Sequence, residues 1–295
     1  MAGQTLSQIR ALLTEAGLTP RQRLGQNFLI DLNLMRKLVQ LAKVGPDDVV
    51  LEVGCGTGSL TELLLETGAA VVGVEIDRGL FELLSRRLGE HPRLKLLNTD
   101  VLADKHHVAP AVLEALRQTP CGPHGVRKLV ANLPYQVATP LLLDLLRAEP
   151  RLERLTCTIQ KEVAQRLAAS PGSKIYGPAS VTCQSLAAIE LHAELPPSVF
   201  WPRPKVDSVV LTLAPWPPER IDIADVDDFE RFVMRGFSQR RKTLRRILRG
   251  WKLEGIDYLL TELGLTSRQR PEELTPEQWR RFHRAVLLAQ QERRA

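Results

Sequence analysis

Between residues 49 and 134 the chain repeats short apolar runs rich in Val and Leu. The runs are VVLEVG (49–54), AVVGVEID (70–77), LKLLNTD (94–100) and KLVANLP (128–134). The first three are each followed by a helical pattern or a long connection. Strands that are apolar throughout, without alternating polar residues, are typical of parallel sheets covered on both faces. The repeat therefore predicts an α/β fold with a doubly wound, Rossmann-like parallel sheet.

Further apolar runs and a later change of pattern indicate how the chain divides into domains. Additional strands are predicted at LTCTIQ (155–160), IELHAEL (189–195) and SVVLTLA (208–214). The last two suit an antiparallel pair at the sheet edge. The Pro-rich APWPPE (214–219) indicates a linker, and the pattern beyond it is helical. We therefore predict an α/β domain with an N-terminal helical extension over residues 1–216, and a smaller helical domain over 217–295.

Positive charge is concentrated in one block, residues 235–252. This block holds eight Arg or Lys and no acid, which exceeds the formal net charge of +6 of the whole chain. Leu244, Ile247, Leu248 and Trp251 recur at helical spacing, so one face is expected in a core. A solvated helix face is the alternative, but the pattern favours binding of a nucleic acid. The predicted RNA-binding residues are Arg240, Arg241, Lys242, Arg245, Arg246 and Arg249.

Other features argue against membrane and metal functions. No apolar stretch approaches the ~20 residues that a membrane span needs. The N-terminal MAGQTLSQIRALLTEAG is typical of a short amphipathic helix and lacks the features of a secretory signal, so a cytoplasmic location is expected. The cysteines lie far apart without a C-x-x-C pair, so no disulfide framework or metal site is predicted. They are Cys55, Cys121, Cys157 and Cys183.

A glycine-rich turn follows the first predicted strand at Gly54-Cys55-Gly56-Thr57-Gly58. Glycines allow a sharp turn and a close approach of ligand to a helix N-terminus, where open α/β sheets bind nucleotides. Glu75 ends the second strand, where a carboxylate can accept hydrogen bonds from ribose hydroxyls. Asp100 ends the third, suitably placed to accept one from an adenine amino group. These positions predict one nucleotide-binding cleft, although the same turn also occurs in NAD-dependent dehydrogenases.

The corner Asn132-Leu133-Pro134-Tyr135 ends the fourth strand beside this cleft. An adenine amine is a poor nucleophile because its lone pair is delocalised into the ring. The side-chain oxygen of Asn132 and the carbonyl of Leu133 could accept both N–H bonds and aim that lone pair at an electrophile. Pro134 stiffens the turn, and Tyr135 offers a face for a flipped base. An ordinary strand-to-loop corner is the alternative, which the neighbouring glycine turn and carboxylates disfavour.

Seven longer segments carry a family resemblance over nearly the whole chain. They are LGQNFLID (24–31), LEVGCGTGSLTELL (51–64), VEIDRGL (74–80), NLPYQVATPLL (132–142), QKEVAQRLAASPGSKIYG (160–177), PPSVFWPRPKVDSVV (196–210) and FSQRRKTLRRIL (237–248). These segments resemble the small-subunit ribosomal RNA adenine dimethyltransferase family. The resemblance implies a class I methyltransferase fold and S-adenosylmethionine as cofactor. It also implies transfer of two methyl groups to the N6 atoms of each of two adjacent adenosines near the 3′ end of small-subunit rRNA.

The resemblance further implies roles for individual residues. The implied cofactor contacts are Asn27, Leu29, Gly54, Gly56, Glu75, Ile76, Asp100, Val101 and Asn132. Within this set, Asn27 and Leu29 would contact the methionine end of the cofactor, and Ile76 would pack on its adenine. Tyr135 and Phe200 would sandwich the flipped base. The catalytic set is accordingly Asn132, Leu133, Pro134, Tyr135 and Phe200, with no metal ion.

The expected reaction is direct in-line attack of the adenine amine on a sulfonium methyl group, without a covalent enzyme intermediate. The expected partner is small-subunit rRNA within the 30S particle, and the default oligomeric state is a monomer. Three alternatives stay open. A dehydrogenase leaves the Asn-Leu-Pro-Tyr corner and the basic helix unexplained. FSQRRKTLRRIL and PRPKVDS argue against a large-subunit rRNA dimethyltransferase of the antibiotic-resistance type. A non-catalytic assembly factor that only binds rRNA is the third.

Overall fold

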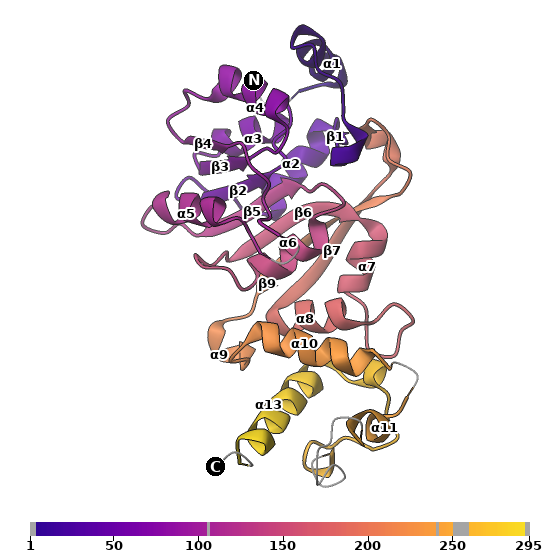
Figure 1. Ribbon diagram of the computed structural model, residues 1–295. Helices are drawn as coiled ribbons and strands as arrows, with labels where there is room; N and C mark the ends of the chain where they lie inside the picture. Colours follow the sequence, from indigo (N-terminus) through magenta and orange to yellow (C-terminus); the bar gives the residue numbers. More distant parts are fainter. Residues whose placement is uncertain (1–3, 105–106, 240–241, 250–259, 293–295) are drawn as a thin grey trace. The chain divides into compact units, whose positions relative to one another are not determined.

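The computed structural model describes residues 4–104, 107–239, 242–249 and 260–292 (Figure 1). The chain divides into two compact units, each with its own hydrophobic core. The first unit comprises Met1–Ala164 and Ile189–Pro215, and the second comprises Gln165–Ala188 and Trp216–Ala295. The second unit therefore contains a segment that lies before the expected boundary at residue 216.

One sheet organises the first unit. Its strands are β2 (Val49–Val53), β3 (Ala70–Val74), β4 (Leu94–Leu97), β5 (Arg127–Asn132), β6 (Arg154–Gln160), β7 (Ala187–Leu195) and β9 (Ser208–Pro215). Within the described residues the order is β4-β3-β2-β5-β6-β9-β7. The pairs from β4 to β6 are parallel, and β9 runs antiparallel to β6. The predicted doubly wound sheet is confirmed, as is the position of β7 and β9 as neighbours at its edge.

The central strands are buried on both faces, as their composition predicts, whereas β4 at the end of the sheet is only half-buried. Every residue of β2 is buried. Val50, Val71 and Val130 belong to the same core cluster as helices α2 (Leu32–Leu41) and α3 (Ser59–Glu66). Side chains alternate along a strand, so the intervening buried residues face the other side of the sheet. They are Leu51, Val72 and Leu129.

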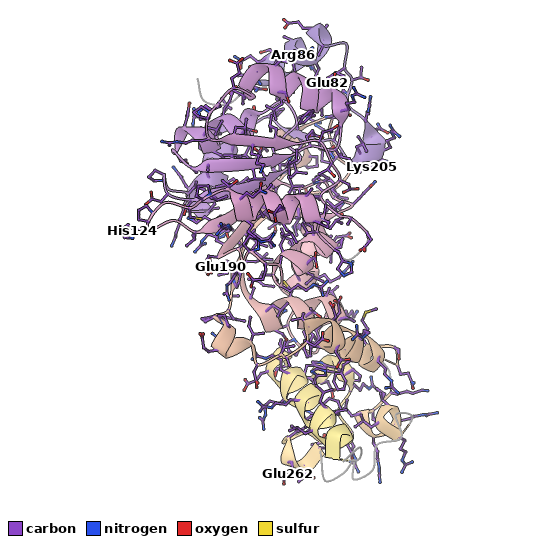
Figure 2. All side chains as sticks on the ribbon, turned by 60° about the vertical axis from the view of Figure 1, so that its left-hand side comes forward. Glu82, Arg86, His124, Glu190, Lys205 and Glu262 are labelled. Carbon is purple, nitrogen blue, oxygen red and sulfur yellow. The ribbon has the colours of Figure 1, made fainter. Side chains whose placement is uncertain are left out.

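The N-terminal helix α1 (Leu6–Glu15) packs against α4 (Arg78–Leu88). Ile9 and Leu13 of α1 share a core cluster with Leu80 and Leu83 of α4. The polar residues Glu82 and Arg86 lie on the outer side of α4, as Figure 2 shows. Both helices therefore bury one apolar stripe, which is the pattern expected for amphipathic surface helices.

A second, two-stranded sheet joins the N-terminal segment to the loop before β9. β1 (Phe28–Leu29) pairs antiparallel with β8 (Phe200–Trp201), with Phe28 opposite Trp201 and Leu29 opposite Phe200. Short 3-10 turns precede each strand, at Gln22–Leu24 and Pro197–Val199. The remaining helices are α5 (Pro110–Gln118), α6 (Ala138–Leu145) and α7 (Lys161–Leu167). This small sheet fixes the QNFL segment beside the carboxyl ends of the main strands.

The second unit is helical, as predicted for the C-terminal part of the chain. Its elements are α8 (Pro178–Leu186), α9 (Pro218–Ile221), α10 (Val226–Phe237), α11 (Leu244–Arg249), the 3-10 turn Pro271–Glu273 and α13 (Pro276–Glu292). Tyr176 and Val181 lie in one core cluster with Phe229 and Trp279. This shared core is why the segment 165–188 belongs to the second unit. The residue pattern alone placed it in the first.

Candidate active site

A cavity of about 300 Å³ opens at the carboxyl ends of β2, β3 and β5 in the first unit. Its walls come from the turn after β2, the ends of β3 and β5, the loop after β4 and residues 24–29. Every cofactor contact expected from the sequence lines it. These are Asn27, Leu29, Gly54, Gly56, Glu75, Ile76, Asp100, Val101 and Asn132. Leu133, Pro134 and Tyr135 line the same cavity, so the structure brings the two sets together.

The glycine turn forms the floor of the cavity. Gly54 and Gly56 have φ values of +76° and +59°, in the left-handed region that favours glycine. A Cβ atom on Gly56 would lie 2.9 Å from the ring of Phe28, which is too close, so any larger residue would displace that ring. Glycine at this position therefore permits both the left-handed turn and the close packing of Phe28.

Glu75 fixes the turn from the end of β3. Its carboxylate accepts hydrogen bonds from the backbone N–H groups of Gly56 at 2.8 Å and Asp77 at 2.9 Å. The side chain is only 4% exposed, and burial raises its pKa above the usual value. Each oxygen keeps a second lone pair, which a ligand hydroxyl could use. The adjacent Ile76 is 46% exposed, which is unusual for a large apolar residue and leaves a face available at the cavity.

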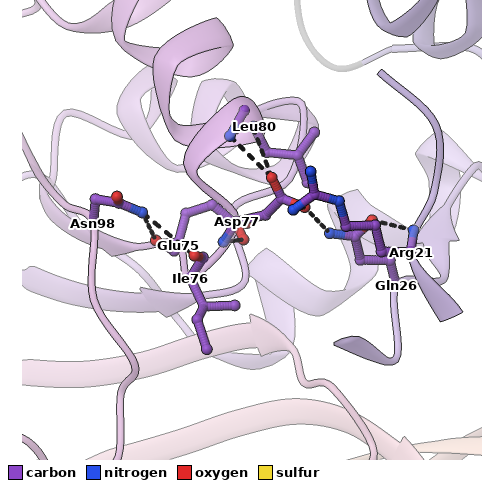
Figure 3. A network of polar contacts seen from close by, with 8 residues as sticks. Arg21, Gln26, Glu75, Ile76, Asp77, Leu80 and Asn98 are labelled. Atoms are coloured by element: carbon purple, nitrogen blue, oxygen red, sulfur yellow. Dashed lines mark hydrogen bonds and ion pairs between the residues drawn. The ribbon is translucent and has the colours of Figure 1, made fainter. Parts of the chain in front are cut away.

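Asp77 connects this site to the N-terminal segment (Figure 3). Its carboxylate caps α4 by accepting from Gly79 N at 2.9 Å, and it also accepts from Gln26 Nε2 at 3.0 Å. Arg21 forms an ion pair with it at 3.2 Å. The sequence analysis did not identify this role, although an Asp directly before a helical pattern is a recognisable N-cap signal.

The Asn132 corner is held by two partners. Asn132 Nδ2 donates to the carbonyl oxygen of Asn27 at 2.8 Å, and the hydroxyl of Thr158 donates to Asn132 Oδ1. The next peptide is also anchored, because Leu133 N donates to the carbonyl oxygen of Thr158 at 3.2 Å. Thr158 was not among the predicted site residues. The run LTCTIQ alternates apolar and polar residues, and nothing in it distinguishes Thr158 from Thr156.

Tyr135 is half-buried, and its hydroxyl is 2.8 Å from the hydroxyl of Ser208 on β9. Burial raises the pKa of the phenol, so it stays neutral at physiological pH. Ser208 is fully buried and was also missed, because nothing in the sequence pairs it with a residue so far along the chain. The contact fixes the ring of Tyr135 in the wall of the cavity.

Glu52 is a further residue that the sequence analysis passed over. It lines the cavity from β2, accepts a hydrogen bond from Thr61 Oγ1 at 2.7 Å and is buried. Burial raises its pKa to about 8, so its carboxyl group is protonated at neutral pH. Asp100 is exposed at the cavity rim, and its Oδ1 accepts from Leu102 N at 3.0 Å.

Phe200 does not lie at the cavity. It is 2% exposed and packs in the core cluster that contains Leu29 and Met35. The small β1–β8 sheet turns it inward, and its neighbour Trp201 stacks on Phe28 with ring centroids 6.2 Å apart. The expectation that Phe200 covers one face of a flipped base is therefore not supported by this arrangement.

The basic residues of α11 point away from the core of the second unit. Leu244, Ile247 and Leu248 are buried, which agrees with the predicted apolar face. The exposed basic residues are Arg245, Arg246 and Arg249 on α11 and Lys242 just before it. Arg240, Arg241 and Trp251 lie outside the described residues. RNA binding by this block stays a prediction.

No group of three or more His, Cys, Asp or Glu side chains in the described residues could hold a metal ion. Among the same residues, no helix has both the length and the apolar character required to cross a membrane.

Two solved structures show the same fold. A dimethyladenosine transferase from Plasmodium falciparum matches with a TM-score of 0.73 and 24% identity, covering 88% of this chain and 97% of that one. The 23S rRNA methyltransferase ErmE matches with a TM-score of 0.64 and 25% identity, covering 88% and 99%.

Curated relatives match at higher identity and over most of their length. Proteins named ribosomal RNA small subunit methyltransferase A match from Moorella thermoacetica (38% identity, 96% of this chain and 97% of the relative) and Lactobacillus delbrueckii (40%, 90% and 90%). One from Streptomyces coelicolor is 39% identical over 94% of each chain. The family model for ribosomal RNA adenine dimethylases matches residues 17–286. The chain therefore belongs to the ribosomal RNA adenine dimethylase family, whose members are methyltransferases.

Proposed function

We propose that this enzyme transfers methyl groups from S-adenosylmethionine to the N6 amines of two adjacent adenosines in the 3′-terminal hairpin loop of small-subunit rRNA. The product would be N6,N6-dimethyladenosine at both positions, made during small-subunit biogenesis. One observation carries the proposal: the anchored amide of Asn132 lines the same cavity as the glycine turn and Glu75. The names of the relatives, at 38% to 40% identity, support the small subunit as the target.

The cavity residues fit S-adenosylmethionine. The cavity has a volume of about 300 Å³, at the lower end of the range for small-molecule sites. The open lone pairs of Glu75 suit ribose hydroxyls, and the exposed side chain of Ile76 suits an adenine face. Gly54 and Gly56 would lie beneath the methionine end, with Asn27 and Leu29 beside it. Asp100 and Val101 would bind the adenine edge. When bound, the cofactor supplies an electrophilic methyl group.

The Asn132 corner would prepare the target amine. Asn132 Oδ1 and the Leu133 carbonyl would accept its two N–H bonds, which favours a pyramidal nitrogen with its lone pair directed into the cavity. Pro134 lacks an N–H group and so offers no competing donor. Tyr135 would support one face of the flipped base, with its ring held by Ser208. With Phe200 buried, we propose the Tyr135 ring as the stacking surface.

The exposed basic residues of α11 would contact rRNA phosphates. Arg245, Arg246 and Arg249 lie on α11 and Lys242 lies two residues before it. Contacts of such residues with phosphates supply affinity that falls steeply with salt. RNA shape, rather than direct reading of paired bases, would select the target hairpin. We propose that the enzyme acts as a monomer in the cytoplasm on the 30S particle, without a metal ion.

The test is transfer of a labelled methyl group to unmethylated 30S particles, followed by mapping of the labelled nucleoside. We expect dimethyladenosine at two adjacent positions near the 3′ end and no label in 50S particles. Asn132→Ala should lower methyl transfer by roughly 100-fold or more, because it removes an acceptor for the target amine. Binding of 30S particles should change less than about twofold, because the proposed phosphate contacts lie elsewhere. Label in 50S particles, or full activity of Asn132→Ala, would contradict the proposal.

A further inference from the structure

We propose that Thr158 is a positioning residue that holds the Asn132 side-chain oxygen and anchors the neighbouring peptide N–H of Leu133. The inference rests on the proposed function, because it concerns the orientation of the target amine. Thr158 lies on β6 directly opposite Asn132 on β5, and it is 1% exposed. Its hydroxyl donates to Asn132 Oδ1, and its carbonyl accepts from Leu133 N at 3.2 Å. One residue therefore contacts both residues that supply acceptors to the amine.

The direction of the Asn132 amide follows from the chemistry of its partners. The Asn27 carbonyl can only accept, so the NH2 group of Asn132 must face it. The oxygen then faces Thr158, whose hydroxyl can donate. A reversed amide would set two acceptors against each other at Asn27. The Thr158 hydroxyl uses one lone pair of Oδ1 and leaves the second for the substrate amine.

Without the hydroxyl, the Asn132 amide keeps only its contact with Asn27. It can then rotate about its side-chain bonds, and its oxygen no longer holds a fixed place relative to the Leu133 carbonyl. The second methylation should be more sensitive than the first. A monomethylated amine has one N–H left, so a single acceptor must orient it. Loss of the hydroxyl should therefore slow both steps and release more monomethylated product.

The same strand provides a matched control. Thr156 lies two residues before Thr158 on β6 and is 0% exposed. Its hydroxyl contacts the hydroxyl of Thr212 at 3.0 Å. Replacing Thr156 by Val removes an equally buried hydroxyl from β6 without touching Asn132. Any difference between the two Val variants reports on the Asn132 contact and not on buried hydroxyls of β6 in general.

The experiment compares Thr158→Val, Thr158→Ser and Thr156→Val in single-turnover methylation of 30S particles. Affinity for S-adenosylmethionine is measured by calorimetry, and melting temperature is measured in parallel. We expect Thr158→Val to lower the rate about five- to tenfold, which corresponds to one lost hydrogen bond, and to raise the share of monomethyladenosine. Cofactor affinity should stay within about twofold, because Thr158 does not line the cavity. Thr158→Ser, which keeps the hydroxyl, should recover most of the rate, and Thr156→Val should react like the unchanged enzyme.

The inference fails if Thr158→Val methylates at the normal rate with the normal product ratio. It also fails if Thr158→Ser is as slow as Thr158→Val, or if Thr156→Val is equally slow, because packing would then explain the loss. Thr158→Val that loses cofactor affinity or melts far below Thr156→Val would likewise assign Thr158 a general structural role. Asn132→Ala separates the two proposals. An active Asn132→Ala overturns the proposed function itself, whereas an inactive one beside a fully active Thr158→Val overturns only this inference.

Discussion

At neutral pH the buried carboxyl group of Glu52 carries a proton, because burial raises its pKa to about 8 in the folded chain. The unfolded chain has an ordinary pKa near 4.5 at this position. Between these values the folded state binds the proton and the unfolded state does not. Glu52 therefore contributes stability that is complete below pH 4.5, declines as the pH rises, and levels off above about pH 8.

Glu52→Gln should remove this dependence on pH. The amide cannot ionise, so the variant should gain stability relative to the unchanged protein as the pH rises from 5 to 8.5, by an amount on the order of a few kcal/mol. The measurement is the difference between the two proteins in free energy of unfolding at each pH. Other carboxylates also make stability depend on pH, such as Asp228, whose pKa is lowered by its hydrogen bond to His283. Their contributions are the same in both proteins and cancel in the difference. A constant difference across this range would show that Glu52 ionises normally.

At the scale of secondary structure elements, the residue that caps α4 also anchors the N-terminal segment. Asp77 caps the helix and also holds Gln26 and Arg21. Asp31 caps α2 in a similar way, accepting from Asn33 N at 2.9 Å and Leu34 N at 3.1 Å. Loss of the helix cap alone should cost about 1 kcal/mol of stability in either Asp77→Ala or Asp31→Ala. Only Asp77→Ala should also weaken binding of S-adenosylmethionine, by about tenfold. The reason is that Gln26, which lines the cavity, loses its hydrogen bond to Asp77.

Thermal unfolding and calorimetric titration of the two variants decide this point. Equal losses of cofactor affinity would show that Asp77 acts only as a helix cap. A larger loss of stability in Asp77→Ala is expected as well, because Gln26 and Arg21 lose a buried partner.

The exposed arginines of α11 are predicted to contact rRNA, and charge reversal tests this prediction. Arg246→Glu combined with Arg249→Glu should weaken binding of 30S particles and lower the salt slope of log K by about one to two, as two phosphate contacts are lost. Affinity for S-adenosylmethionine should not change, because the cavity is formed by the first unit alone. The control is Arg36→Glu with Lys37→Glu, an equal charge change at exposed positions of α2. An unchanged salt slope in the α11 variant would exclude these residues from the RNA interface.

For the molecule as a whole, the order of apolar runs was sufficient to predict the sheet, since β2 to β6 are apolar and separated by helices. Motifs at the carboxyl ends of strands predicted the glycine turn, Glu75, Asp100 and the Asn132 corner, whereas Asn27 and Leu29 came from the family resemblance alone. Contacts between distant segments could not be predicted. Thr158 meets Asn132 and Ser208 meets Tyr135 only through strand pairing. Phe200 was expected to stack on the flipped adenine base, but it is buried in the core. The sequence of a two-residue strand does not reveal which way its side chains face.

The second unit is assembled from two pieces of chain, with β7 and β9 of the first unit encoded between them. Its buried Tyr176 donates to the carbonyl of Leu274, 98 residues further on. At ~5–20 residues per second, Leu274 is translated roughly 5–20 seconds after Tyr176. We expect the sheet that carries the cavity to close with β9 during that interval. The first unit would then be complete before the second, and the apolar residues around Tyr176 would stay uncovered for longer.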